Sequence, residues 1–364
     1  MIFMVIKPID QKKFRIIFQR VSDFDFIKNE LEKNKKIIFG KKGTIVDLKI
    51  KIIRAYWLNK QRLHKFVIKY KIKFRPLKGK GKIFNIYAKA QDNLKQDDVL
   101  KVLNILLNKG FKRGIFRVQI PIMSLEKGMV LFYHELKGEE FLNYFKDSSL
   151  SVLRKYIKKL AQLITKLHQI KFNNYFSIPS NEGIIKQNKT WIRKNIISLE
   201  KTLKLKNFRK KFLPLYDSLL SNIQKIIKPC LLHNDFTPDN IIINKNYIGL
   251  LDFSIYKFAD PAEELASFMT RLIMIAEKIP YKTYGHLNLS LKTAEELNKL
   301  FLEEYIKKNN LDDNFKFKVF LYISIYLLGF AQYTLNFENN KKGAQILINK
   351  AKAYAQGFNN FTHL

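Results

Sequence analysis

A short polar loop between two apolar runs carries the residues whose types and spacing suit catalysis. The loop His233–Asn240 reads HNDFTPDN, and a second short apolar run after it ends at Asp252. Transfer of a phosphoryl group needs a carboxylate that orients the attacking hydroxyl and accepts its proton, together with oxygen ligands for Mg²⁺. Asp235 fits the first task. Asn240 and Asp252 fit the second, because Mg²⁺ prefers hard oxygen ligands and retains several waters.

The composition describes a long and strongly basic chain. Its 364 residues suffice for two lobes with a core each, and 67 Lys and Arg against 31 Asp and Glu give a net charge of +36. Such a charge can attract nucleic acid or an anionic membrane. Most of the cations are scattered lysines, however, whereas a nucleic-acid reader usually concentrates arginine. We therefore favour a compositional bias and keep a polyanionic partner as the alternative.

Targeting and redox signals indicate a cytoplasmic protein. The single cysteine, Cys230, cannot form an internal disulfide. The N-terminus lacks the basic segment and cleavage site of a signal peptide. The longest uncharged stretch, Val319–Phe337, is interrupted by polar residues and is predicted to be a buried helix rather than a membrane span.

The first part of the chain has the two-residue periodicity of β-strands. Basic and apolar residues alternate in Lys65–Phe74, and the residues Asp47–Trp57 and Lys82–Gln91 are also rich in strand formers. A helix is predicted over Lys95–Lys109, with Gly110 as its C-cap. Two further strands are predicted at Arg117–Ser124 and Met129–Leu136, which gives the order β-β-β-α-β-β.

After Gly138 the pattern becomes helical. Amphipathic helices are predicted at Leu150–Ile170, Ile185–Leu205 and Phe208–Ile227, and helices dominate from Pro261 onward. The sequence thus predicts an α+β fold with two lobes. Residues 1–136 form a small β-rich lobe, in which residues 1–45 stay unassigned, and residues 137–364 form a larger helical lobe.

The catalytic segment resembles that of the protein-kinase-like phosphotransferases, and within them the aminoglycoside phosphotransferase and choline kinase family. The pattern His-x-Asp-x-x-x-x-Asn, followed by a strand, a turn and Asp252, is the shared signature. The run Asp260–Ala266, DPAEELA, is similar to the family's Gly-Asp-Pro-x-x-Asp-Leu-Ala. Because this run follows soon after Asp252, the chain leaves no room for an activation loop. An interval of 65 positions separates His168 from His233, and the small-molecule branch fills this interval with helices of the acceptor pocket.

The resemblance implies a bilobal fold in which ATP, with Mg²⁺, donates its γ-phosphoryl group to a hydroxyl of a small molecule. It implies that Lys89 contacts the α- and β-phosphates and that the hinge residues Glu135 and Leu136 receive the adenine. The turn before the second strand has no glycine, so Lys60 and Arg62 are expected to contact the phosphates through their side chains.

Supporting roles are expected for three further residues. His233 is expected to hold the catalytic loop, Asp260 to orient it, and Glu264 to brace the helix behind it. The helix after Lys89 has no glutamate to pair with that lysine, so either Asp97 or Asp98 replaces it or the ion pair is missing.

Other functions stay open at this point. A kinase-like fold with weak catalysis could serve as a binding module for nucleic acid or another polyanion, and a kinase acting on proteins is disfavoured by the missing activation loop. Trp191 is expected to be a packing residue, with a cation-binding aromatic box as the alternative. The net charge favours an anionic or neutral, sugar-like acceptor. The acceptor's identity, the choice between ATP and GTP, and the oligomeric state are not determined.

Overall fold

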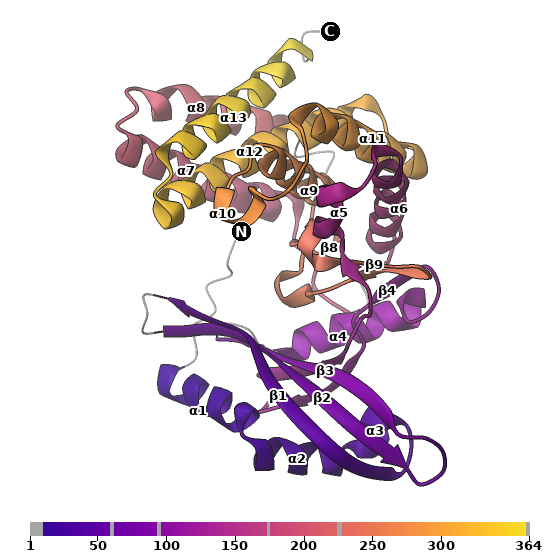
Figure 1. Ribbon diagram of the computed structural model, residues 1–364. Coiled ribbons are helices and arrows are strands. Elements are labelled where there is room, and N and C mark those ends of the chain that lie inside the picture. Colours follow the sequence, from indigo (N-terminus) through magenta and orange to yellow (C-terminus); the bar gives the residue numbers. More distant parts are fainter. Residues whose placement is uncertain (1–9, 59–61, 93–95, 173–174, 224–227, 362–364) are drawn as a thin grey trace. The chain divides into compact units, whose positions relative to one another are not determined.

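The computed structural model of the chain describes residues 10–58, 62–92, 96–172, 175–223 and 228–361 (Figure 1). These residues form two compact units, which we describe one at a time. Within the described residues, the N-terminal unit comprises residues 10–138 and 242–254, and the helical unit comprises residues 139–241 and 255–361. The segment that carries Asp252 therefore belongs to the N-terminal unit, although the sequence had suggested a single boundary near residue 136.

A five-stranded antiparallel sheet forms the body of the N-terminal unit. Its strand order is β1-β2-β3-β6-β5. The bounds are β1 Gly43–Leu58, β2 Arg62–Pro76, β3 Lys82–Gln91, β5 Pro121–Leu125 and β6 Val130–His134. The first three strands agree with the predicted ones. The predicted strand at Arg117–Ser124 is wrong: it is divided into β4 (Phe116–Val118) and β5, which belong to different sheets.

The alternation along β2 divides the sheet into an apolar face and a basic face. Phe66, Ile68, Tyr70, Ile72 and Phe74 are buried. The intervening residues are mostly lysines, because successive side chains of a strand point to opposite faces. Burial of the apolar series, worth about 2 kcal/mol for a large side chain, therefore fixes the register and sends the lysines to the other face.

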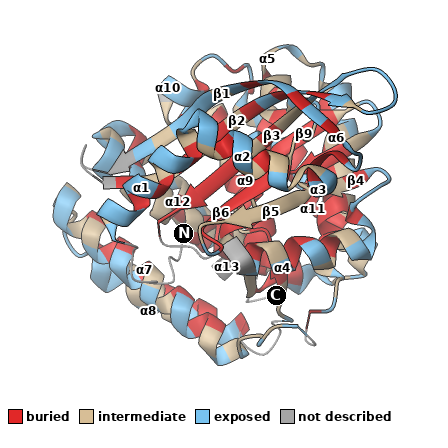
Figure 2. Cartoon of the chain, turned by 90° about the horizontal axis from the view of Figure 1, so that it is seen from below, coloured by how far each residue is buried: buried red, intermediate tan, exposed pale blue. Residues whose placement is uncertain are grey.

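Three helices cover the apolar face, and they account for most of the stretch that the sequence left unassigned. They are α1 (Gln11–Ser22), α2 (Phe24–Lys33) and α3 (Lys35–Phe39). In Figure 2 they lie in front of β1, β2 and β3, with exposed residues outward and buried residues beneath them. Asp10 and Asp23 cap α1 and α2 by accepting backbone N–H bonds. The Tyr70 hydroxyl donates to the carbonyl of Val21 over 2.7 Å and fastens α1 to the sheet.

A second, smaller sheet and one helix complete the N-terminal unit. Strand β10 (Tyr247–Leu250) runs parallel to β4 and lies between it and β9 (Ile241–Asn244). Helix α4 (Gln96–Leu106) packs against β5 and β6. It continues as one π-helical turn, Leu107–Phe111, in which Gly110 has a φ of 88°. Only a residue without a Cβ adopts this angle freely, so the helix ends where the sequence predicted.

The helical unit begins at a short strand, β7 (Glu139–Glu140), and is otherwise mostly helical. Its helices are α5 Tyr144–Asp147, α6 Leu150–His168, α7 Asn181–Leu203, α8 Phe208–Ile223, α9 Pro261–Ala276, α10 Tyr281–Tyr284, α11 Leu291–Asn309, α12 Asp313–Glu338 and α13 Lys341–Phe361. Strand β8 (Cys230–Leu232) pairs with β11 (Lys257–Ala259), which directly precedes α9 in the chain. Helix α7 begins four residues before its predicted start, because Ser180 caps it by accepting from the N–H of Gly183.

The uncharged stretch near the C-terminus lies within α12. Among the described helices, α12 is the one long and apolar enough to cross a membrane, and 61% of its most apolar window is buried inside the protein. It packs mainly against α13 and α9. This placement agrees with the predicted buried helix.

Candidate functional site

Asp252 follows β10 in a backbone conformation that few residue types accept. Its φ is 65°, in the left-handed region, where Asp and Asn are tolerated better than other residues with a side chain. Its N–H donates to the side-chain oxygen of Gln119 over 3.0 Å. This bond and the parallel pairing of β10 with β4 hold the turn that presents the carboxylate.

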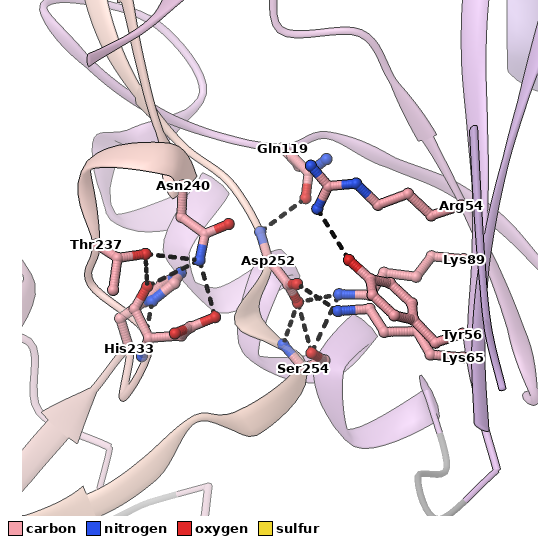
Figure 3. A network of polar contacts seen from close by, with 11 residues as sticks. Arg54, Tyr56, Lys65, Lys89, Gln119, His233, Thr237, Asn240, Asp252 and Ser254 are labelled. Atoms are coloured by element: carbon pink, nitrogen blue, oxygen red, sulfur yellow. Dashed lines mark hydrogen bonds and ion pairs between the residues drawn. The ribbon is translucent and has the colours of Figure 1, made fainter. Parts of the chain in front are cut away.

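Two lysines and a serine surround the Asp252 carboxylate (Figure 3). Lys89 on β3 forms an ion pair with Oδ1, and Lys65 on β2 approaches Oδ2 at 3.2 Å. Ser254 donates its N–H and its hydroxyl to Oδ1 and accepts a 3.1 Å bond from the Lys89 ammonium. Both lysines lie on the basic face of the sheet, because Lys89 faces Val67 in the register and Lys65 is two residues away.

The electrostatics of this cluster keep Asp252 anionic. Burial alone would raise the pKa of Asp252, but the charges of Lys89 and Lys65 outweigh it and hold the pKa well below its usual value. Burial lowers the pKa of Lys89 to about 8, and the neighbouring Lys65 contributes to this decrease against the attraction of Asp252. At neutral pH the cluster therefore holds one carboxylate between two ammonium groups.

The carboxylate partner of Lys89 is Asp252, and not a residue of the helix that follows β3. Asp98 on α4 is exposed, and Asp97 lies among residues whose side chains the structure does not describe. The sequence pattern could not show this pairing, because Lys89 and Asp252 are 163 positions apart. It also missed Lys65, whose position opposite Gln91 becomes visible only from the strand register.

The predicted hinge carries a dense set of polar bonds. The Glu135 carboxylate accepts from Asn85 at 2.7 Å, from Lys69 at 3.0 Å and from Tyr87 at 3.2 Å. Burial would raise its pKa, but the bonds from Asn85 and Lys69 lower it below its usual value. The Glu135 N–H donates to the carbonyl of Asn85, so this group is not free for a nucleobase. Leu136 is half-buried beside Gly249.

The turn expected before β2 carries the two predicted phosphate contacts, Lys60 and Arg62. Lys60 lies outside the described residues. Arg62 begins β2, but its side chain is also outside them. Their predicted contacts with phosphates therefore stay predictions.

The helical unit holds the catalytic loop with Asp235 and Asn240 in contact. The Asn240 side-chain amide donates to the Asp235 carboxylate and to the Asp235 carbonyl, each over 2.9 Å, and to the Thr237 hydroxyl over 3.3 Å (Figure 3). Within the described residues all hydrogen bonds of this side chain come from Nδ2. Its Oδ1 atom is therefore left as a metal ligand of the hard-oxygen type that Mg²⁺ prefers.

A buried glutamate fixes the backbone at the start of the loop. Glu264 on α9 accepts the N–H of His233 at 2.6 Å and the N–H of Asn234 at 2.8 Å. Asn234 has a φ of 65° and donates its side-chain amide to the carbonyl of Ile255. The Nδ1 atom of the buried His233 accepts a 3.3 Å bond from the Asp235 N–H. These four hydrogen bonds thus fix the direction in which the loop turns before Asp235.

Asp260 acts at the start of α9 and not at the loop itself. Its side chain caps the helix by accepting from the N–H of Ala262. It also forms a fully buried ion pair with Lys318 of α12, at 2.9 Å. Since α9 carries Glu264, this pair ties the orientation of the glutamate to the core helix α12.

Arg271 is a residue near the loop that the sequence did not single out. It lies on α9, donates to the Tyr284 hydroxyl over 3.3 Å, and stacks over the Phe330 ring. Burial alone would lower its pKa, but Tyr284 and the carboxylates of Asp239 and Asp235 raise it. A permanent cation therefore lies near Asp235. A lone arginine at helical spacing gives no signal that could have revealed this position.

A narrow cavity of about 20 Å³, with room for about one water molecule, adjoins Asn234 in the helical unit. Its walls include Trp191, which lies 6.1 Å from the Tyr326 ring, centroid to centroid. Lys257 and Glu263 form an ion pair at its edge, and Asn188 donates to the same glutamate. Trp191 therefore packs against α12 and at the same time lines a cavity whose charges are balanced.

The protein's own groups fit a magnesium ion that relies mainly on phosphate and water oxygens. Among the described residues no cluster of three or more His, Cys, Asp and Glu side chains could hold a metal ion. Asp252 in the N-terminal unit is an anionic carboxylate, and Asn240 in the helical unit offers a side-chain oxygen. Each is a ligand type that Mg²⁺ accepts, and in nucleotide sites this ion typically takes one or two protein ligands.

Solved structures show which fold the chain has. It aligns with a choline kinase from Cryptosporidium parvum Iowa II at a TM-score of 0.57 and 14% identity, over 93% of this chain and 95% of that one. The streptomycin–ATP complex of the aminoglycoside phosphotransferase APH(2'')-IIa aligns at 0.54 and 16%, over 91% and 99%. A putative aminoglycoside phosphotransferase from Ralstonia eutropha JMP134 aligns at 0.53 and 12%, over 92% and 97%. The chain thus has the predicted bilobal, protein-kinase-like α+β fold.

Sequence comparison gives the family. No curated protein matches the chain closely enough to count as a relative. The sequence model of the family described as "Phosphotransferase enzyme family" matches residues 112–297, which is 186 of the 364 residues and includes Asp235, Asn240 and Asp252. The chain belongs to this aminoglycoside phosphotransferase-type family and is a phosphotransferase.

Proposed function

We propose that the protein transfers the γ-phosphoryl group of ATP to a hydroxyl group of a small molecule. The observation that carries this proposal is the loop geometry, in which a buried glutamate fixes the backbone and an asparagine amide holds the Asp235 carboxylate. A carboxylate held in this way can orient an attacking hydroxyl and accept its proton. The ATP named in one similar structure and the ADP named in another support the choice of donor.

Each remaining residue of the site has a task in the proposal. Lys89 and Lys65 bring two positive charges to the nucleotide phosphates, which compensates for the glycine-free turn. Asp252 and the Oδ1 atom of Asn240 are the proposed ligands of Mg²⁺. When bound, this ion neutralises charge on the phosphates. Leu136 and the carbonyl side of the Glu135 backbone are the proposed contacts of the base, since the Glu135 N–H is already used.

The acceptor is proposed to be a neutral or anionic, sugar-like molecule. The net charge of +36 disfavours a cationic acceptor and favours a neutral or anionic one. Arg271, near Asp235, disfavours a cation at the loop.

The first test is the melting temperature with ATP, with and without Mg²⁺, for wild type and for Asp252→Asn. A ligand at one hundred times its dissociation constant stabilises the native state by about 2.7 kcal/mol. We expect a Mg²⁺-dependent increase in the wild type that the variant loses. No increase at millimolar ATP in the wild type would contradict the proposal.

The second test is turnover. Asp235→Ala should reduce phosphoryl transfer, measured as ADP release with a panel of sugar-like acceptors, by a factor of about 10² or more. The variant should keep the ATP-dependent increase in melting temperature. If Asp235→Ala retained full turnover on an acceptor that the wild type phosphorylates, the assignment of Asp235 as the base would be wrong.

A further inference from the structure

Positive charge is concentrated on the basic face of the N-terminal sheet. The register places nine cations on this face, and we call them the lysine face: Lys49, Lys51, Arg54, Lys65, Lys69, Lys71, Lys73, Arg75 and Lys89. The proposed nucleotide site accounts for Lys65 and Lys89, which contact Asp252. It does not account for the cations on the other half of β1 and β2.

Two pairs of lysines on this outer half lie directly opposite each other. Lys49 faces Lys71, and Lys51 faces Lys69. Directly opposed residues in an antiparallel sheet have Cβ atoms about 5 Å apart, and like charges there are destabilising. Lys69 is bonded to Glu135. Lys49, Lys51 and Lys71 are exposed and form no ion pair with any carboxylate in the part of the chain that the structure describes.

A lysine-rich composition alone does not explain this arrangement. The exposed residues of α11 come from the same chain, and this helix carries four lysines and four glutamates. On the lysine face the strands themselves contribute one carboxylate, Asp47, opposite Lys73. The repulsion between unpaired opposed lysines persists in the fold, and a bound anion would relieve it.

The spacing of the cations fits a chain of phosphates. Every second residue of a strand points to the same face, so Lys69, Lys71 and Lys73 repeat at about 6.8 Å along β2. Val67 interrupts the series before Lys65, and Lys65 to Lys73 extends over about 27 Å. The repeat is comparable with the distance between neighbouring phosphates of an extended nucleic-acid strand. Tyr56 is 44% exposed on the same face, so a ring for base stacking accompanies the charges.

We propose that the lysine face binds single-stranded nucleic acid along β1 and β2, with Lys49, Lys51 and Lys71 as its phosphate contacts. The proposal does not depend on the proposed phosphotransferase activity. Other polyanions, such as inorganic polyphosphate or an anionic membrane, offer charge without bases to stack.

The test is binding of a fluorescein-labelled 12-nucleotide oligouridylate to the full-length protein, followed by anisotropy over a series of KCl concentrations. The variant K49Q/K71Q removes one opposed pair. The matched control K292Q/K307Q removes two exposed lysines of α11. For single strands the slope of log K against log salt is about −0.7 per phosphate contact. We expect K49Q/K71Q to bind at least five-fold more weakly, with a slope smaller by about 1.4, and the control to bind like the wild type.

A stability measurement excludes a folding defect. Since K49Q/K71Q relieves a repulsion, its melting temperature should equal or exceed that of the wild type while its binding is weaker. Equal losses in both variants, or no loss in either, would overturn the proposal. The proposal would also be overturned if Mg²⁺–ATP displaced the oligonucleotide completely and K49Q/K71Q bound it as tightly as the wild type. In that case the oligonucleotide would occupy the nucleotide site. Binding of polyphosphate or of phosphatidylserine vesicles without binding of the oligonucleotide would also overturn it.

Discussion

Glu264 shows how one residue sets the position of the proposed base without contacting a substrate. Its two carboxylate oxygens accept the backbone N–H groups of His233 and Asn234. A hydrogen bond to a charged acceptor contributes about 1.5–3 kcal/mol. We expect Glu264→Gln to lower the free energy of unfolding by about 2 kcal/mol and to reduce turnover, because one of the two N–H groups loses its acceptor.

Chemical denaturation and ADP release measure the two effects of Glu264→Gln. The control is Glu296→Gln on α11, whose carboxylate forms an exposed ion pair with Arg154. Such pairs contribute about 0–1 kcal/mol, so the control should behave like the wild type. Full turnover in Glu264→Gln would show that the loop holds its geometry without this clamp.

Cys230 allows a direct chemical test of the surroundings of the loop. Burial raises the pKa of its thiol well above the usual value, and the carboxylates of Glu264, Asp260 and Glu263 add to the increase. The thiolate is the reactive form, so a raised pKa leaves less of it at any given pH. We expect the native protein to react with iodoacetamide at pH 8 at least ten-fold more slowly than the urea-unfolded protein. Equal rates, followed by mass spectrometry, would contradict the placement of this residue.

At the scale of elements, the sequence predicted best those segments whose periodicity reports burial directly. The strands β1 to β3 and the helices α6 and α8 were found within a few residues. Helices α1 to α3 were not found, because they are short, with 12, 10 and 5 residues. Their apolar residues are buried only by contact with the sheet that they cover, so the sequence of each helix alone does not reveal its buried face. The ion pair of Lys89 with Asp252 was missed for a related reason, since it depends on the pairing of distant strands.

The packing of α7 on α12 provides the test at this scale. A Cβ added to Gly329 would lie 2.3 Å from the Trp191 ring, so the glycine makes room for the wall of the cavity. We expect Gly329→Ala to destabilise the protein by about 1–3 kcal/mol through overpacking. Gly183→Ala in the first turn of α7 is the matched control, because its Cβ meets ordinary contacts of 3.4 Å and more. Equal melting temperatures for the two variants would contradict the close packing of Trp191 on Gly329.

At the scale of the whole molecule, two lobes could be predicted from the sequence, but not which strand joins which unit. The segment Ile242–Ser254 follows the catalytic loop, yet it groups with the N-terminal unit because β10 pairs with β4. Parallel pairing between segments about 130 residues apart leaves no periodic signal at either end. Motif spacing, in contrast, singled out Asp235, Asn240 and Asp252 as candidates, because the spacing of a motif reflects the chemistry it would perform rather than the packing of the chain.

The net charge of +36 leads to a prediction for the folded state as a whole. Mutual repulsion of like charges destabilises a compact state, and salt screens it, with a Debye length of about 10 Å at 0.1 M and 3 Å at 1 M. Salt also weakens the attraction within exposed ion pairs, which lowers stability, but each such pair contributes about 1 kcal/mol or less. We therefore expect the melting temperature to rise by several degrees between 20 and 300 mM KCl. K49Q/K71Q should show a smaller rise, because one opposed lysine pair is already gone, whereas the α11 control K292Q/K307Q should follow the wild type. A melting temperature that falls as salt is added would contradict this prediction. It would mean that ion pairs stabilise the fold by more than the repulsion between like charges destabilises it.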